Sequence, residues 1–120
     1  MATWQGWQTD LLKAAGLPTS ADNRTFLTDW GAAEKTNCTN NPVVISFKAR
    51  GSTDCKPLTN TRTAQNYQNH GQAGSAFSNQ LHSGNFPHLL AALRDGTPFS
   101  VPSPHDVIAD LIVWGAETYA

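Results

Sequence analysis

Five stretches of the chain repeat apolar residues at three- and four-residue steps, which is the spacing of helices with one buried face. Helices are therefore predicted over residues 3–15, 20–34, 72–82, 87–95 and 104–114. Glycine follows several of these stretches and proline opens the last two, as is typical of helix ends and starts. The residues predicted to face the core are Trp4, Trp7, Leu11, Ala14, Ala15, Phe26, Leu27, Trp30, Ala33, Ala73, Ala76, Phe77, Leu81, Leu89, Leu90, Leu93, Ile108, Leu111 and Ile112.

The middle of the chain has a different pattern. Residues 43–48 alternate, with Val43 and Ile45 on the same side, and this predicts a strand. Residues 50–54 have the composition of a turn. Residues 56–70 are polar and irregular, and we interpret them as a weak second strand followed by a loop. A chain of 120 residues without an internal repeat fits one domain, residues 1–120, with one core.

Composition narrows the classes of partner. Only 14% of the residues are charged and the net charge is −1, without a basic cluster, so nucleic acid is not expected as a partner. No apolar run approaches the roughly 20 residues that span a bilayer, so no membrane partner is expected either. The histidines are scattered, and neither a metal site nor a cofactor motif is present. The many amide and hydroxyl side chains suit a neutral, hydroxyl-rich ligand.

Two cysteines, Cys38 and Cys55, flank the candidate hairpin. A disulfide between them would stabilise the fold by about 3 kcal/mol in the chain-entropy model. Folding in a reducing cytosol would instead leave two free thiols, so the sequence leaves both states open.

Glu34 lies at the end of the second predicted helix, four residues after Trp30 on its apolar stripe. A carboxyl group in such a place is partly desolvated, and desolvation raises the pKa of an acid. A general acid in glycoside cleavage has this property. The alternative interpretation is an exposed glutamate in a last helical turn, beside the ordinary C-terminal cation Lys35.

Several short motifs occur in a fixed order along nearly the whole chain. They are Trp30 with Glu34, Asn41-Pro42, Ala64-Gln65-Asn66-Tyr67, Gly84-Asn85-Phe86, the run from Leu90 to Gly96, and Trp114-Gly115. In this order the chain resembles the small lysozyme-like domain of endolysins, tail proteins and other virion proteins of actinobacterial phages. It departs from that family at Lys35, where glycine is usual, at Val43 in place of leucine, and at Ala116-Glu117 in place of Thr-Gly.

The resemblance implies an α+β, lysozyme-like fold with a mostly helical body and a small β-hairpin beside a sugar-binding cleft. It implies that Glu34 protonates the glycosidic oxygen of peptidoglycan, in a muramidase or a lytic transglycosylase. Asp54 in the turn is the candidate second carboxylate, although a turn-forming role is its alternative. The residues expected to line or support the cleft and bind the glycan are Trp30, Asn41, Gln65, Asn66 and Tyr67.

A second function is compatible with the same residues. The chain could be a catalytically inactive virion structural or cell-wall-binding protein that retains the fold, because Lys35 follows Glu34 and the second carboxylate is weakly supported. The expected partners are glycan strands and, for a particle component, other virion proteins. Without a secretion signal, the expected location is the virion, or the host cytoplasm before lysis, with action at the bacterial cell wall.

Overall fold

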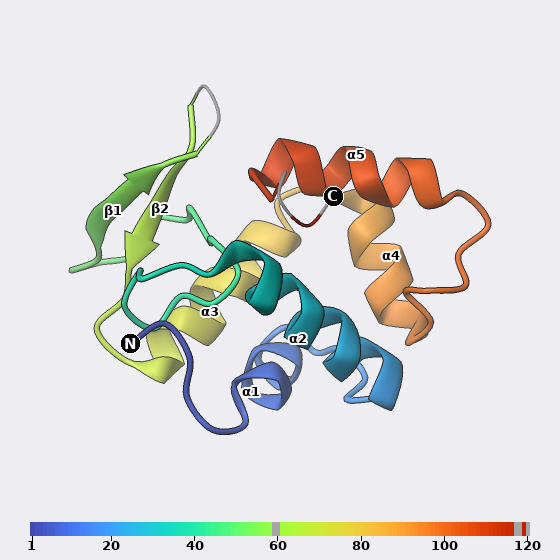
Figure 1. The fold of residues 1–120 in the computed structure, drawn as a ribbon, viewed down its shortest axis with the longest axis horizontal. Coiled ribbons are helices and arrows are strands. Elements are labelled where there is room, and N and C mark those ends of the chain that lie inside the picture. Colours follow the sequence, from blue (N-terminus) through green and yellow to red (C-terminus); the bar gives the residue numbers. More distant parts are fainter. Residues whose placement is uncertain (59–60, 117–118, 120) are drawn as a thin grey trace.

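The chain forms five helices and one antiparallel two-stranded sheet over the residues that the structure, a computed structural model, describes: 1–58, 61–116 and 119. The fold is therefore α+β. The elements are α1 (Trp7–Ala14), α2 (Ala21–Glu34), β1 (Thr53–Pro57), β2 (Thr63–Asn66), α3 (His70–Leu81), α4 (Pro87–Asp95) and α5 (Pro104–Trp114). Figure 1 shows that α2 runs through the middle of the molecule, with its C-terminal end toward the hairpin and with α4 and α5 on the other side.

The predicted helix ends agree closely with the structure from α2 onward. Ser20 caps α2, because its hydroxyl accepts a hydrogen bond from the backbone N–H of Asn23 at 3.2 Å. Gly96 and Gly115 end α4 and α5 with positive φ angles of 73° and 101°. Proline occupies the first turn of both helices, as predicted.

The first helix is shorter than the predicted range 3–15. Gly6 adopts a left-handed conformation with φ 77°, so the helix begins only at Trp7. Trp4 therefore lies outside the helix, where its ring stacks on His70 with centroids 4.1 Å apart. Its indole N–H also donates to Asp10 at 2.8 Å.

The core forms where α2, α3, α4 and α5 meet, around Trp30 and Trp114. Both indoles are fully buried and meet edge to face with ring centroids 5.2 Å apart. The predicted core residues that the structure buries are Trp7, Leu11, Ala15, Phe26, Leu27, Trp30, Ala73, Ala76, Phe77, Leu81, Leu89, Leu93 and Leu111. Fully burying one large apolar side chain contributes about 1.5–3 kcal/mol, so this set supplies much of the driving force for folding.

The predicted inner face of the last helix is wrong in part. Ile108 and Ile112 are 37% and 45% exposed, whereas Asp110 is buried. The carboxylate of Asp110 accepts the backbone N–H groups of His88 and Leu89 at 2.7 and 2.9 Å, at the start of α4. Because a helix N-terminus leaves its N–H groups unpaired, this contact stabilises both helices and turns the two isoleucines outward.

The strand predicted over residues 43–48 is also wrong. Val43, Val44 and Ile45 are all fully buried, and Phe47 is 39% exposed, so the side chains do not alternate. Val44 has a positive φ of 49°, which interrupts any extended conformation. The segment passes through the core as an irregular connection.

Side chains take the place of strand pairing along this connection. Asn41 donates to the carbonyl of Ile45 and accepts its N–H, both at 2.8 Å. The side-chain amide oxygen of Gln80, Oε1, accepts the backbone N–H groups of Ser46 and Phe47 at 2.8 and 2.7 Å. Buried backbone groups need partners, and here amide side chains supply them.

The hairpin lies later in the chain than predicted. Its strands pair in the register Thr53 with Asn66 and Pro57 with Thr63, so the second strand falls within the predicted range 56–70. The predicted turn at 50–54 is a real turn at its start, with Gly51 at φ 86°, but it precedes the hairpin instead of joining its strands. Thr59 and Asn60, predicted as part of the polar run, lie outside the described residues.

Candidate active site

Glu34 is the last residue of α2, as predicted, and the chain leaves the helix abruptly after it. Lys35 takes a left-handed conformation with φ 47° and ψ 40°, and its N–H closes the last turn on the carbonyl of Gly31. Such a conformation is costly for any residue with a Cβ, and glycine is the usual residue there. The departure from the family pattern at Lys35 therefore falls on a position that prefers glycine for conformational reasons.

The Glu34 carboxyl group is partly removed from water. One of its oxygens, Oε1, is buried and has no hydrogen-bond partner among the described residues. Burial raises the pKa of Glu34 above its ordinary value of 4.5, and the positive charge of Lys56 and the backbone N–H of Tyr119 offset part of this rise. The partial burial of the Glu34 carboxyl group agrees with its predicted place on the apolar stripe of α2.

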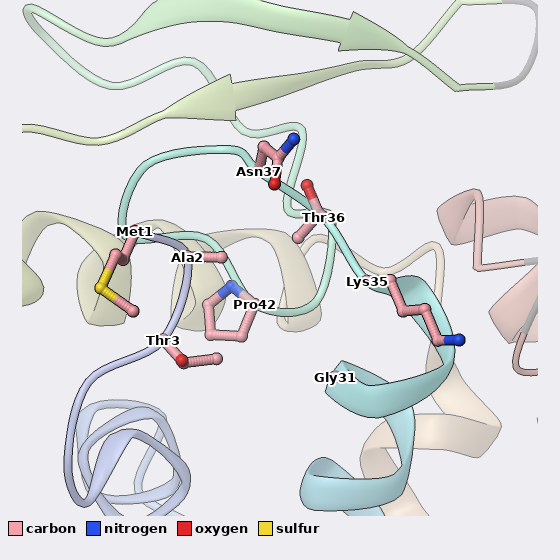
Figure 2. Close-up of a pocket in the computed structure, with 8 residues that line it drawn as sticks. All are labelled: Met1, Ala2, Thr3, Gly31, Lys35, Thr36, Asn37 and Pro42. Carbon is pink, nitrogen blue, oxygen red and sulfur yellow. The ribbon is translucent and has the colours of Figure 1, made fainter.

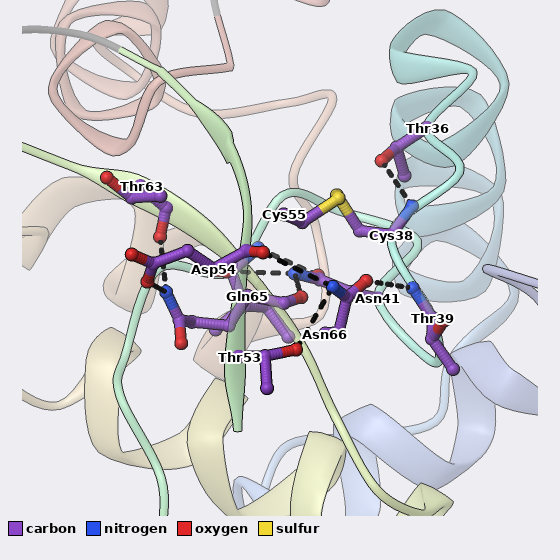
Figure 3. Close-up of a disulfide and its surroundings, with 11 residues drawn as sticks. Thr36, Cys38, Thr39, Asn41, Thr53, Asp54, Cys55, Thr63, Gln65 and Asn66 are labelled. Atoms are coloured by element: carbon purple, nitrogen blue, oxygen red, sulfur yellow. Dashed lines mark hydrogen bonds between the residues drawn. A yellow bond between two sulfur atoms is a disulfide. The ribbon is translucent and has the colours of Figure 1, made fainter. Parts of the chain in front are cut away.

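A disulfide between Cys38 and Cys55 joins the loop after Glu34 to the first strand of the hairpin (Figure 3). The two α-carbons are 5.6 Å apart, within the usual range for a bridge. Of the two states that the sequence left open, the structure contains the disulfide. The bridge ties the loop after Glu34 to the hairpin and so keeps the hairpin close to the end of α2.

A β-bulge decides which hairpin side chains face Glu34. Asp54 pairs with Gln65 and Lys56 pairs with Ala64, so β1 advances by two residues where β2 advances by one. Paired residues share a face and successive residues of β2 point to opposite faces, so the extra residue places Asp54 and Lys56 on opposite faces. Lys56 is the one whose charge acts on Glu34.

Asp54, the candidate second carboxylate, belongs to a separate hydrogen-bond network. Its Oδ1 accepts from the amide of Gln65 at 2.8 Å, and the carbonyl oxygen of that amide accepts from Ser52 at 2.9 Å. Figure 3 shows the carboxylate beside Gln65. The structure therefore does not bring Asp54 together with Glu34, because the bulge turns it to the other face.

The predicted glycan-binding residues are mostly internal. Asn41 and Gln65 are 0% and 1% exposed, and the side chain of Asn41 also donates to the carbonyl of Gln65 at 2.8 Å. The hydroxyl of Tyr67, itself buried, donates to the carbonyl of Phe47 at 2.6 Å. Asn66 is partly exposed, but its side-chain oxygen, Oδ1, accepts the backbone N–H of Thr39 at 2.8 Å. These side chains hold the loop and the hairpin in place.

Trp30 packs into the core beside the last turn of α2, which carries Glu34. It is fully buried one helical turn before Glu34, and its indole N–H has no hydrogen-bond partner among the described residues. The ring of Tyr119 stacks on Trp30 with centroids 6.3 Å apart and planes 9° apart. Burial and the nearby Asp29 raise the pKa of Tyr119 to about 12, so it stays neutral.

Sequence reasoning missed Lys56 and Tyr119. Both act on Glu34 through the tertiary structure, Lys56 across the hairpin and Tyr119 from the end of the chain. A lone lysine in a polar stretch and a tyrosine after the last helix carry no periodic signal. The bulge in β1 could not be predicted from the sequence either, because it depends on how the two strands pair.

A cavity of about 430 Å³ lies next to the loop after Glu34, but Glu34 is not among its lining residues. Figure 2 shows the N-terminal residues Met1, Ala2 and Thr3 beside Pro42, with Thr36 and Asn37 on the far side. The described residues contain no cluster that could hold a metal ion. No described helix is both long enough and apolar enough to cross a membrane.

Comparisons with family models, with curated proteins and with solved structures found no match to this chain.

Proposed function

We propose that the chain has a lysozyme-like fold and cleaves the glycan strands of peptidoglycan, with Glu34 as the general acid. The observation that carries the proposal is the state of the Glu34 carboxyl group. One oxygen is buried without a partner, and burial raises the pKa. A raised pKa keeps a carboxyl group protonated to higher pH, so it can donate a proton to a leaving oxygen where an ordinary glutamate is ionised.

The site supports one protein acid in this reaction. Glu34 donates its proton to the glycosidic oxygen as the bond breaks, and positive charge develops at the sugar carbon. Glycosidases usually supply a second carboxylate, but Asp54 lies on the other face of the hairpin. The N-acetyl group of the substrate can supply the missing assistance, as in other substrate-assisted glycosidases. The bond proposed to break joins N-acetylmuramic acid to N-acetylglucosamine.

The alternative function is an inactive virion structural or wall-binding protein. Two observations favour it. The charge of Lys56 lowers the pKa of Glu34, which opposes the role of an acid. Asn41 and Gln65 use their side chains in internal hydrogen bonds. In either case we propose the virion, or the host cytoplasm before lysis, as the location and the bacterial cell wall as the target.

The test compares Glu34→Gln with Asp54→Asn in digests of actinobacterial peptidoglycan. Both changes remove one carboxylate and keep the side-chain shape, so they are matched controls for each other. We expect Glu34→Gln to lower the rate by about 10²–10⁴-fold, because general acid catalysis is worth that much. We expect Asp54→Asn to keep the rate within about threefold of wild type, since its amide oxygen can still accept from Gln65.

Mass analysis of the products separates the two functions. New reducing ends indicate a muramidase and 1,6-anhydro ends a transglycosylase, and either product supports the proposal. Equal cleavage by wild type and Glu34→Gln would remove Glu34 from the mechanism. Absence of cleavage by wild type, with all proteins folded, would favour the structural alternative.

A further inference from the structure

Arg62 is a half-buried cation without an anionic partner among the described residues. It lies one residue before β2, where its backbone carbonyl accepts the N–H of Leu58 at 2.8 Å. Burial lowers the pKa of its guanidinium, and none of the ion pairs between described residues involves it. Burying part of a charge costs free energy unless an opposite charge or hydrogen bonds compensate for it.

The guanidinium is held in a fixed position. It donates to the hydroxyl of Ser46 at 3.2 Å, and its central carbon lies 5.0 Å from the centre of the Phe86 ring. The Ser46 hydroxyl in turn donates to the side-chain amide oxygen of Gln80 at 3.3 Å, and Gln80 is itself buried. The aromatic face and this hydrogen bond orient the planar group, and its remaining N–H donors have no acceptor among the described residues.

Arg62 shares a face of the hairpin with Lys56, the cation that acts on Glu34. Leu58, one residue after β1, lies opposite Arg62, and Lys56 in β1 is two residues before Leu58. That spacing corresponds to about 7 Å along the strand. Arg62 is thus a second positive charge on the side of the hairpin that faces the proposed acid.

We propose that Arg62 is a specificity residue that binds an oxyanion, a carboxylate or a phosphate, carried by the glycan next to the bond that is cleaved. The inference rests on the proposed function. A fixed guanidinium matches such groups with paired hydrogen bonds, whereas a neutral sugar offers it none of comparable strength. Arg62 therefore distinguishes anionic wall glycan from neutral chitin-type oligosaccharides, which have the same backbone linkage.

The test measures binding on a Glu34→Gln background, so that no ligand is consumed. The ligands are a neutral N-acetylglucosamine hexamer, peptide-bearing glycan oligomers with their carboxylates, and the same hexamer carrying a phosphate. We expect one or both anionic ligands to bind about 10- to 100-fold more tightly than the neutral one. The ligand with the larger gain identifies the carboxylate or the phosphate as the recognised group.

Arg62→Met should reduce this preference to near unity, with a much larger loss of affinity for the anionic ligands than for the neutral hexamer. Arg62→Lys, which keeps the charge without the planar fork, should retain a smaller part of it. Arg94→Met removes an exposed arginine from the last turn of α4 and should leave the preference intact. Rising salt should weaken the preference in the parent protein and have little effect in Arg62→Met.

The outcomes separate this inference from the proposed function. If the parent binds both classes of glycan and Arg62→Met keeps the same preference, Arg62 is a packing residue and only the inference fails. If the parent binds no glycan at all, both the proposed function and the inference fail. Thermal melts accompany each variant, and if Arg62→Met does not fold, an undiminished preference in Arg62→Lys overturns the inference.

Discussion

The end of α2 and the first strand of the hairpin each carry a carboxylate, but their surroundings differ. At the end of α2, Glu34 has a buried oxygen without a partner, and the pKa is raised by burial. On the hairpin, Asp54 accepts a hydrogen bond from Gln65, which is held in turn by Ser52. The first group has an oxygen without a partner among the described residues, whereas the second is held by hydrogen bonds within the hairpin.

The difference shows how to separate chemistry from architecture in a polar region. Asn41, Gln65 and Tyr67 look like ligand-binding residues in the sequence, yet their polar groups bond to backbone and side chains inside the fold. A buried polar group that already has its partners contributes to stability. A partly buried one that lacks a partner among the described residues, such as Glu34, costs stability and is a candidate for a function.

The largest expected effect is on stability, from Asn41→Ala. The change removes the acceptor of the Ile45 N–H and one donor to the backbone carbonyl of Gln65, and both groups lie in the core. We expect the free energy of unfolding to fall by about 4 kcal/mol. Denaturant unfolding measures this, with Asn37→Ala as the control because Asn37 is exposed. A loss below about 1 kcal/mol would show that Asn41 is not a scaffold residue.

The next effect comes from the bridge between the two regions. Replacing both Cys38 and Cys55 by serine should lower the free energy of unfolding by about 3 kcal/mol, and reduction of the wild type should have a similar effect. Activity at a temperature where the variant is folded should also fall, because the hairpin is no longer tied to the loop after Glu34. An unchanged melting temperature after reduction would contradict this role.

A smaller effect, of opposite sign, is expected from Glu34→Gln. The raised pKa means that the native state binds the Glu34 proton more tightly than the unfolded chain does, so wild type loses stability as pH rises from 4.5 through the native pKa. Glutamine lacks this loss. The variant should therefore match wild type well below pH 4.5 and be slightly more stable at neutral pH. Melts across pH measure the difference, and a variant less stable than wild type at neutral pH would contradict the sign.

The helical part of the fold could be predicted from the sequence because its signals are local. Helix stripes, Ser20, the prolines and the terminal glycines all act within a few residues of each other. The position of Glu34 followed from the same stripe. The inner face of α5 was predicted less well, since a buried carboxylate at Asp110 counts as polar in any pattern although it caps another helix.

The region between residues 36 and 69 could not be predicted in the same way. Its order depends on contacts between distant residues, such as those of Gln80 with the connection at 46–47 and of Cys38 with Cys55. The bulge in β1 has no signal in the sequence, and it places Asp54 and Lys56 on opposite faces although they are two residues apart. Asp54 was predicted to lie in the turn at 50–54, but it belongs to β1 and its carboxylate is bonded to Gln65.

The most direct test of the account is the titration of Glu34 in the folded protein. Carboxyl-carbon NMR follows the protonation of each glutamate and aspartate, and the Glu34 signal is identified by its absence in Glu34→Gln. The account predicts a midpoint for Glu34 above 4.5, because burial outweighs the opposing effects of Lys56 and of the Tyr119 backbone. A midpoint at or below 4.5 would contradict the claim that Glu34 is a desolvated acid.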